Sequence, residues 1–201
     1  MSTTVEEWNE EVDLAVVGFG AAGACAAIQA AQDGAEVAVI DRFVGGGATA
    51  ISGGIFYAGG ETHIQKEAGV TDTVDDMFNY LKLEVKDAVS DRTLRDFCEN
   101  SASNLRWLEE QGLEFEASLC PYKTSYPLDH FCLYYSGNEP AASHAQHARP
   151  AQRGHRVKGK GMPGRRFFEP LKRAAHALGM KFFYQSRVER LISDAAGRII
   201  G

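Results

Sequence analysis

Val12-Asp-Leu-Ala-Val-Val-Gly-Phe-Gly-Ala-Ala-Gly23 is the stretch that decides the fold of this chain. Residues 12–17 are mostly apolar and show no helical period, which predicts a buried β-strand that ends at a glycine. The small residues at 24–31 predict a helix, and a second strand at residues 35–40 follows and ends in Asp41. Strand, glycine turn, helix, strand and acid together indicate a βαβ unit that binds a dinucleotide.

Three glycines give the turn the spacing G-x-G-x-x-G, and each has its own task in such a unit. Gly18 permits the tight turn, Gly20 lets a pyrophosphate approach the backbone, and Gly23 allows the helix to pack closely on the strand. The backbone amides of Ala21, Ala22 and Gly23 open the helix, where the helix dipole favours an anion. The motif therefore predicts where the phosphates of a dinucleotide would bind.

Two other interpretations of this stretch fit the residues less well. A lone G-x-G-x-x-G also occurs in ordinary loops. Here, however, Asp41 stands where it can accept hydrogen bonds from an adenosine ribose, and its charge would repel a 2′-phosphate. The run at residues 12–31 is nearly long enough to cross a bilayer, yet Asp13 and three glycines make it a poor lipid-facing helix. We therefore predict a dinucleotide site and no transmembrane segment.

A second glycine-rich segment, residues 45–54, follows the acid almost directly. A nicotinamide-binding domain usually continues here into another crossover helix, whereas this backbone would run along a ligand, with Thr49 and Ser52 offering hydroxyls. The run Ala-Thr-Ala-Ile at residues 48–51 has too few polar residues for a solvated linker. A long, flat ligand that extends past the pyrophosphate fits this segment, so FAD is favoured over NAD.

Composition limits the classes of function that the chain can have. Its 201 residues are 44% hydrophobic and carry a formal net charge of −6, which suits a globular domain and argues against nucleic-acid binding. Residues 1–11 are polar and acidic and lack the features of a secretory signal, so a flexible leader is expected. The four cysteines form no C-x-x-C pair and are expected to be reduced thiols of a cytoplasmic protein, with a Cys120–Cys132 disulfide as the alternative.

Downstream of the glycine segments the sequence alternates between helical and irregular stretches. Helices are predicted at residues 71–89 and 91–111, with Phe97 among the core positions of the second. Residues 118–139 are rich in tyrosine, proline and glycine, and their tyrosines could line a pocket, transfer protons or simply pack. These stretches are interpreted as scaffold around the cofactor segments.

The C-terminal third is predicted to begin with a long connection at residues 143–166. Its basic run at residues 149–166 contains no acid and is interpreted as a solvated surface, with contact to the pyrophosphate of FAD as the alternative. Its histidines lack the neighbours of a metal site. A helix at residues 165–178 with Leu178 on its buried side, a strand at residues 181–185 and a hairpin at residues 188–201 with its turn at residues 194–197 are predicted to follow. Because a parallel sheet needs further strands, the chain is expected to be a fragment of a larger protein.

The whole chain resembles the N-terminal part of the fumarate reductase/succinate dehydrogenase flavoprotein family. The matching pieces are Gly18-Phe-Gly-Ala-Ala-Gly23, Ile40-Asp-Arg42, Gly46-Gly-Ala-Thr-Ala-Ile-Ser-Gly-Gly54 and the terminal strand and hairpin with Val188. Within the family it looks most like the 3-ketosteroid dehydrogenases, especially those that desaturate the 4,5 bond. That closer likeness rests on Lys123-Thr-Ser-Tyr-Pro127, Tyr134-Tyr-Ser-Gly-Asn-Glu139 and Arg153-Gly-His-Arg156.

The resemblance implies a doubly wound, Rossmann-like FAD-binding domain with a parallel sheet, incomplete at its C-terminus. Residues 12–201 would be the first segment of this domain, without the capping domain and the returning FAD segment. By position, the residues at the ADP half would be Ala22, Gly23, Asp41 and Arg42, with the backbone of Val188 at the adenine. The ribityl-flavin half would lie on Ala48, Thr49, Ser52, Gly53 and Gly54. Membrane-bound relatives attach flavin through a histidine where this chain has Gly47, so FAD should be noncovalent.

The implied chemistry is a trans dehydrogenation next to a ketone, at the 4,5 or 1,2 bond of a 3-ketosteroid. A base, often tyrosine in such relatives, takes a proton alpha to the carbonyl while a hydride passes to flavin N5. Tyr126 is the one substrate-side candidate here, and because most catalytic residues would lie beyond Gly201, the chain alone is expected to be inactive. A small-molecule substrate and an external electron acceptor would be its partners. The alternatives are a fumarate or enoate reductase of the same fold, or an inert, truncated FAD-binding module.

Overall fold

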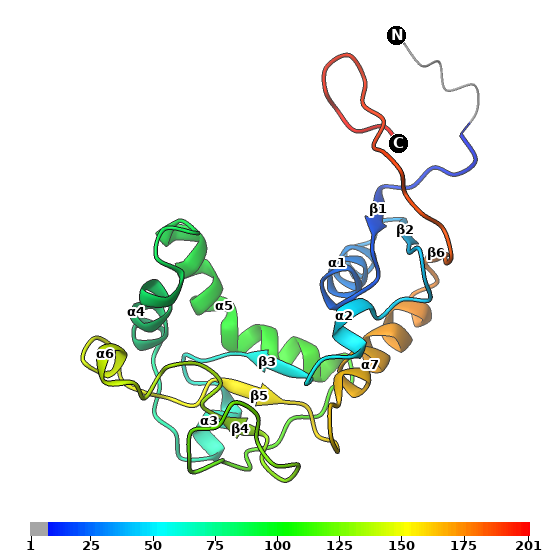
Figure 1. Ribbon diagram of the computed structural model, residues 1–201. Helices are drawn as coiled ribbons and strands as arrows, with labels where there is room; N and C mark the ends of the chain where they lie inside the picture. Colours follow the sequence, from blue (N-terminus) through cyan, green and yellow to red (C-terminus); the bar gives the residue numbers. More distant parts are fainter. Residues whose placement is uncertain (1–7) are drawn as a thin grey trace. The chain divides into compact units, whose positions relative to one another are not determined.

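Two parallel strands joined by a helix surround the first glycine motif, as the sequence predicts. In the computed structural model, which describes residues 8–201 (Figure 1), strand β1 (Leu14–Val17) leads into helix α1 (Ala21–Gln32), and strand β2 (Val37–Ile40) follows. Strand β6 (Lys181–Phe183) pairs with the other side of β2, which gives the order β1-β2-β6. Both pairings are parallel. The parallel sheet and its crossover helix confirm the predicted α/β class.

The described residues divide into two units. Unit 1 contains the parallel sheet and comprises the described residues up to Ala48 together with residues 171–201, whereas unit 2 comprises residues 49–170. Of the predicted leader, residues 1–7 lie outside the described residues, and residues 8–11 form neither helix nor strand.

The core of unit 1 lies between α1 and the middle strand of the sheet. Helix α1 packs against both β1 and β2 and buries Ala24, Ala27 and Ile28. Strand β2 is the central strand and is buried from Val37 to Val39. The strand predicted at residues 12–17 forms at Leu14–Val17, but its predicted burial is wrong apart from Val16. Strand β1 is an edge strand of this sheet, and Val17 is 57% exposed.

The C-terminal part of unit 1 agrees with the predicted order of elements but not with every boundary. Helix α7 (Gly164–Ala177) precedes β6, as predicted, but Leu178 just beyond its end is exposed rather than buried. The predicted hairpin at residues 188–201 forms only an isolated antiparallel bridge between Ser193 and Ile199, closed by a turn at residues 194–197. The turn was therefore predicted correctly, and the regular strands were not.

Unit 2 contains an antiparallel sheet that the sequence did not reveal. Its strands are β3 (Ile55–Tyr57), β5 (Gly154–Arg156) and β4 (Leu133–Tyr134), in the order β3-β5-β4. Residues 143–166 were expected to be a connection, yet they supply the central strand. Strands of two or three residues are too short to show a period of two, which explains why the pattern was missed.

The longer helices of unit 2 form where the sequence predicts them. Helix α4 (Val74–Val85) begins after Thr73, whose hydroxyl accepts the amide of Asp76, and helix α5 (Asp91–Glu110) packs against α4. Phe97 of α5 is 40% exposed, so its assignment to the core was wrong. Short helices complete the described elements: α2 (Gly47–Ala50), α3 (His63–Glu67) and α6 (Ala142–Ala145).

Most basic side chains of the run at residues 149–166 are exposed, as the sequence suggested, but the middle of the run is not. Residues 153–157 are buried, and the side chains of Arg153 and Arg156 are fully enclosed. Their place beside the central strand β5 takes them into the interior of unit 2. Their acidic partners come from distant parts of the sequence, so the run itself gives no sign of charge compensation.

The carboxylate of Asp72 compensates the buried positive charge of Arg153. The guanidinium donates through Nε to Oδ2 of Asp72 at 2.9 Å and through Nη2 to Oδ1 at 2.6 Å. The same carboxylate also accepts the backbone amides of Gly60 and Thr73 and the side-chain amide of Gln65. Both members of the pair have no exposed side-chain surface. A buried ion pair of this kind destabilises the fold strongly when one partner is removed.

His155 lies on the opposite face of β5 from Gly154 and Arg156 and is neutral because it is buried. Burial lowers the pKa of His155 to about 4, although the hydrogen bond with the carbonyl of Arg153 acts in the other direction. Since that carbonyl can only accept, Nδ1 carries the proton and Nε2 accepts the hydroxyl of Thr62 at 2.9 Å. The histidine thus ties β5 to the start of α3 without carrying charge.

Asp72→Asn is expected to lower the free energy of unfolding of unit 2 by about 3–5 kcal/mol, because it leaves the charge of Arg153 buried without its partner. In a Trp8→Phe background, Trp107 is the remaining tryptophan and reports the urea unfolding of unit 2.

The matched control is Asp75→Asn in the same background. Asp75 pairs with Arg95 at 2.6 Å, but its side chain is 79% exposed, so the loss should be only about 0–1 kcal/mol. Equal losses in the two variants would contradict the weight given to the buried pair.

Candidate cofactor site

The first glycine motif forms the tight turn and the close packing that its sequence predicts. Gly18 has a φ of +93°, in the left-handed region that favours glycine, and its amide donates to the carbonyl of Ile40 at 2.8 Å. A Cβ on Gly23 would collide with the carbonyl oxygen of Gly18 and would lie 3.2 Å from Cγ1 of Val16. The conformational roles of Gly18 and Gly23 are therefore confirmed, and their contact with a cofactor stays a prediction.

The start of α1 is suited to an anion. Gly20 is the N-cap and provides no side chain to cap the helix, and the first turn contains no acidic residue. The partial positive charge of the helix N-terminus is therefore not balanced by a carboxylate of its own first turn. Ala21, Ala22 and Gly23 form this first turn, at the place where the sequence predicts a pyrophosphate.

Asp41 lies beside this turn because the two strands are parallel. Its Oδ2 accepts the amide of Phe19 and its Oδ1 accepts the amide of Phe43, both at 2.7 Å. Its own amide donates to the carbonyl of Phe183 at 2.9 Å, which ties it to β6 as well. A carboxylate has about four lone-pair sites, so two backbone donors leave capacity for ribose hydroxyls.

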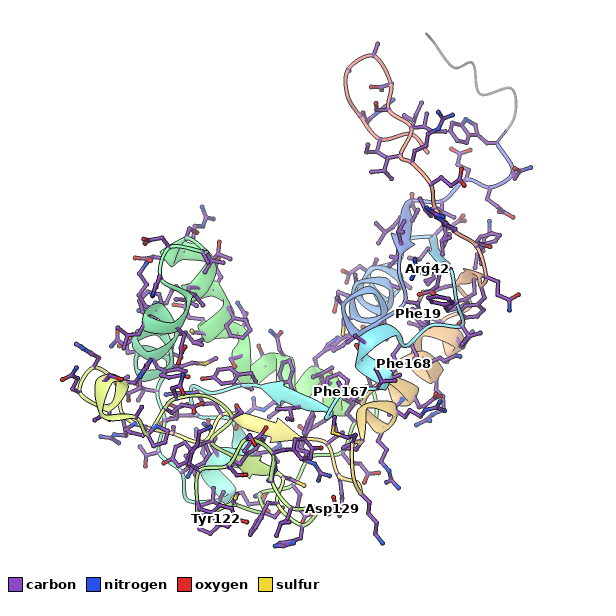
Figure 2. The ribbon with its side chains drawn as sticks, in the orientation of Figure 1. Phe19, Arg42, Tyr122, Asp129, Phe167 and Phe168 are labelled. Carbon is purple, nitrogen blue, oxygen red and sulfur yellow. The ribbon has the colours of Figure 1, made fainter. Side chains whose placement is uncertain are left out.

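Arg42 and Val188 occupy less constrained positions in unit 1. The guanidinium of Arg42 lies over the ring of Phe43, 4.6 Å from its centre, and Arg42 is exposed (Figure 2). Val188 is partly buried in the irregular stretch after β6. Their predicted contacts with the ADP half and the adenine stay predictions.

An aromatic cluster at the carboxyl edge of the parallel sheet was not predicted. Phe19 contacts the rings of Phe182 and Tyr184, with centroid distances of 5.4 and 6.4 Å. Burial raises the pKa of Tyr184, and the charge of Asp41 raises it further. Tyr184 directly follows β6, and the rule that ligands bind beyond the carboxyl ends of parallel strands could have drawn attention to it.

The second glycine segment begins with three residues that require glycine. Gly45, Gly46 and Gly47 have φ angles of 84°, 93° and 46°, and the amide of Gly46 donates to the carbonyl of Phe19 at 2.6 Å. A Cβ on Gly47 would meet no atom within 4 Å. The start of the segment is therefore tied to the first turn and open beside Gly47. Ala48 continues it as part of α2 and is exposed.

The end of the segment, in unit 2, is packed more tightly. Ser52 donates its hydroxyl to the carbonyl of Thr49 at 2.8 Å and accepts the amide of Gly54 at 3.1 Å. A Cβ on Gly54 would lie 2.7 Å from Val157, and one on Gly53 would lie 2.6 Å from the ring of Tyr126. Packing within unit 2 thus explains both glycines without a ligand, and ligand contact at these positions stays a prediction.

The hydroxyl of Tyr126 has three partners within unit 2. It lies 2.9 Å from the carbonyl oxygens of Gly53 and Gly161, and Nε of Arg156 donates to it at 2.9 Å. One proton serves two carbonyls, and the guanidinium occupies a lone pair. The catalytic role of Tyr126 stays a prediction, and these contacts by themselves favour a structural one.

The remaining sequence expectations concern the cysteines, metal sites and membrane spans of the described residues. The four cysteines are free thiols, so the alternative Cys120–Cys132 disulfide is not formed. Within residues 8–201, no three His, Cys, Asp or Glu side chains cluster closely enough to hold a metal ion. None of the helices in that range is long and apolar enough to cross a membrane.

Comparison with known proteins gives extensive matches. Residues 13–201 match the family described as FAD binding domain. The 3-oxo-5-alpha-steroid 4-dehydrogenase of Comamonas testosteroni is 46% identical over 199 residues, which are 97% of this chain and 37% of that protein.

Solved structures agree with this result. The 3-ketosteroid-Δ4-(5α)-dehydrogenase of Rhodococcus jostii RHA1, crystallised with 4-androstene-3,17-dione, matches with a TM-score of 0.94 and 37% identity, over 100% of this chain and 43% of that one. An open conformation of a flavocytochrome c3 fumarate reductase matches with a TM-score of 0.74 and 27% identity, over 92% and 28%. The chain thus spans less than half the length of these relatives.

Gly23→Ala is expected to destabilise the packing of α1 on β1 by about 1–3 kcal/mol, because the added methyl group must push the helix away from the carbonyl of Gly18. Hydrogen exchange of the α1 amides measures the change as lost protection. Ala26→Ser, on the exposed face of the same helix, is the control and should cost about 0.5 kcal/mol or less. Unchanged protection in Gly23→Ala would contradict the close approach of helix and strand.

Proposed function

Because this chain belongs to the FAD-binding family of fumarate reductase and succinate dehydrogenase flavoproteins, we propose that it forms the cofactor-holding part of an FAD-dependent oxidoreductase. Residues 12–201 would be the first segment of the FAD-binding domain in that protein. The whole protein would dehydrogenate a 3-ketosteroid at its 4,5 bond. The 46% identity with a steroid 4-dehydrogenase over nearly the whole chain supports this substrate class.

One observation carries the cofactor assignment. The N-terminus of α1, with no acid in its first turn, and the carboxylate of Asp41 lie at the same edge of a parallel sheet, linked through the amide of Phe19. An anion-binding helix start beside a hydroxyl-binding carboxylate is what the pyrophosphate and ribose of a dinucleotide require.

The residues of the chain would bind and orient the cofactor rather than react. The amides of Ala22 and Gly23 would hold the pyrophosphate, and Asp41 would accept the ribose hydroxyls. Bound FAD supplies the acceptor for a hydride from the substrate. Gly47, which stands where membrane-bound relatives have the attaching histidine, offers no side chain for a covalent bond, so the cofactor would be held noncovalently.

Asp41→Ala is expected to weaken FAD binding by about tenfold or more, since it removes the ribose acceptor and frees the amides of Phe19 and Phe43. Titration of FAD fluorescence measures the dissociation constant, and acid denaturation should release all bound flavin into the supernatant. Asp33→Ala, which removes an exposed carboxylate at the end of α1, is the control. Flavin that stays with the precipitated chain would contradict noncovalent binding. A chain that takes up no FAD even when joined to the remainder of its polypeptide would contradict the proposal.

The substrate class is tested on the chain joined to the remainder of its polypeptide. A saturated 3-ketosteroid should bleach the oxidised flavin, because it donates the hydride, and an artificial acceptor should restore the colour. Fumarate is the competing reagent: if the reduced flavin is re-oxidised by fumarate and the oxidised flavin is not bleached by the steroid, the reductase alternative holds. A flavoprotein that responds to neither reagent would favour the inert-module alternative.

A further inference from the structure

Arg156 is a fully buried guanidinium that connects two loops of unit 2. Nη1 donates to the carbonyl of Asp129 at 3.1 Å, and Nη2 lies 2.8 Å from the carbonyl of Gly159 and 3.0 Å from that of Gly161. Its acidic contact is Oδ1 of Asp129 at 3.2 Å, on a side chain that is 52% exposed (Figure 2). Unlike Arg153, Arg156 is held mainly by neutral carbonyl oxygens. Such an arrangement fixes backbone positions.

The third nitrogen of this guanidinium, Nε, orients the hydroxyl of Tyr126. Nε of Arg156 donates to a lone pair of that oxygen, so the hydroxyl proton must point elsewhere. The available acceptors are the carbonyls of Gly53 and Gly161, each 2.9 Å away. The guanidinium therefore leaves the Tyr126 proton to the carbonyl of Gly53, in the second glycine segment, or to that of Gly161.

Gly53 is held by Tyr126 in two independent ways. Its carbonyl accepts the hydroxyl, and the ring lies so close to its Cα that a methyl group there would be 2.6 Å from Cε2. The next residues are held by β5: the carbonyl of Gly54 accepts the amide of Val157 at 2.9 Å, and Ile55 is in register with Arg156. The backbone at residues 53–55 is thus fixed by Tyr126 from one segment and by residues 156–157 from another.

We propose that Arg156, acting through Tyr126, is a positioning residue for the glycine segment that holds the flavin half of the cofactor. The inference rests on the proposed function, because it takes the segment at residues 47–54 to be the flavin-binding one. Neither side chain needs to touch a substrate for this role. Removal of the Tyr126 hydroxyl leaves the Gly53 carbonyl without its side-chain donor, and removal of the Arg156 guanidinium leaves that donor without a fixed direction. In either case the segment can adopt other conformations.

The test compares Tyr126→Phe and Arg156→Lys with two matched controls in the FAD-loaded protein. Tyr122→Phe removes an exposed hydroxyl from the same loop, and Arg153→Lys alters an equally buried guanidinium that pairs with Asp72. The dissociation constant of FAD, the visible spectrum of the bound flavin and its midpoint potential are measured together with the urea midpoint of unfolding.

Tyr126→Phe and Arg156→Lys are expected to raise the dissociation constant by about tenfold and to shift the flavin spectrum. The first removes the hydroxyl that donates to Gly53, and the second removes the guanidinium that orients this hydroxyl. Lysine cannot reproduce the five-donor fork of arginine, so Arg156→Lys should not be neutral. Tyr122→Phe should behave as wild type. Arg153→Lys should lower the unfolding midpoint and leave the affinity and spectrum unchanged.

The following outcomes would overturn the inference. Equal shifts of affinity and spectrum in Arg153→Lys would show a general loss of stability. Wild-type affinity and spectrum in Tyr126→Phe would remove the positioning role, and a loss of turnover beside that unchanged affinity and spectrum would assign a catalytic role instead. If Arg156→Lys fails to fold, Tyr126→Phe decides, because it removes a single oxygen atom. A wild-type protein that binds no FAD would refute the proposed function and this inference together, whereas normal FAD binding by all variants would refute this inference alone.

Discussion

The arrangement of unit 1 depends on the hydrogen bonds that the carboxylate of Asp41 accepts from backbone amides. The carboxylate accepts one amide from the turn after β1 and one from the turn after β2, and the backbone of Asp41 joins β6. The turns after β1 and β2 are thereby tied to the carboxyl edge of the parallel sheet. A charged acceptor strengthens such hydrogen bonds to backbone amides. The same carboxylate lies beside the start of α1. Asp41 therefore both holds the two turns together and offers a hydrogen-bond acceptor to a ligand at this edge.

The two buried arginines of unit 2 show two different ways of enclosing a charge. Arg153 lies against a carboxylate that is itself buried and satisfied by neighbouring amides. Arg156 lies among carbonyl oxygens and contacts a carboxylate that remains half exposed. The first arrangement fixes one ion pair in the core, while the second joins loops that are far apart in the sequence. Similar residues three positions apart therefore have different structural roles because their acceptors differ.

The glycines of the second segment differ in the space beside them. At its start, positive φ angles require glycine, and the space beside Gly47 is open. At its end, Gly54 also has a positive φ of 63°, but here the ring of Tyr126 and the side chain of Val157 additionally exclude a Cβ at Gly53 and Gly54. A glycine-rich sequence close to a cofactor motif suggests ligand contact along its whole length. The structure separates positions that leave room beside the backbone from positions that are filled by the protein itself.

The sequence by itself determined the βαβ unit, its glycine turn, its terminal acid and the two long helices, because these features depend on contacts between residues close in the chain. Gly18 and Gly23 adopt the roles that their spacing predicts, since a turn and a helix start are local structures. Only the tertiary structure decided that Arg153 and Arg156 of the basic run are buried, that β5 is the centre of an antiparallel sheet, and that Tyr126 contacts Gly53. Asp72 is 81 residues from Arg153, and Gly53 is 73 residues from Tyr126. No local pattern encodes such pairings, because they form only when distant segments pack together.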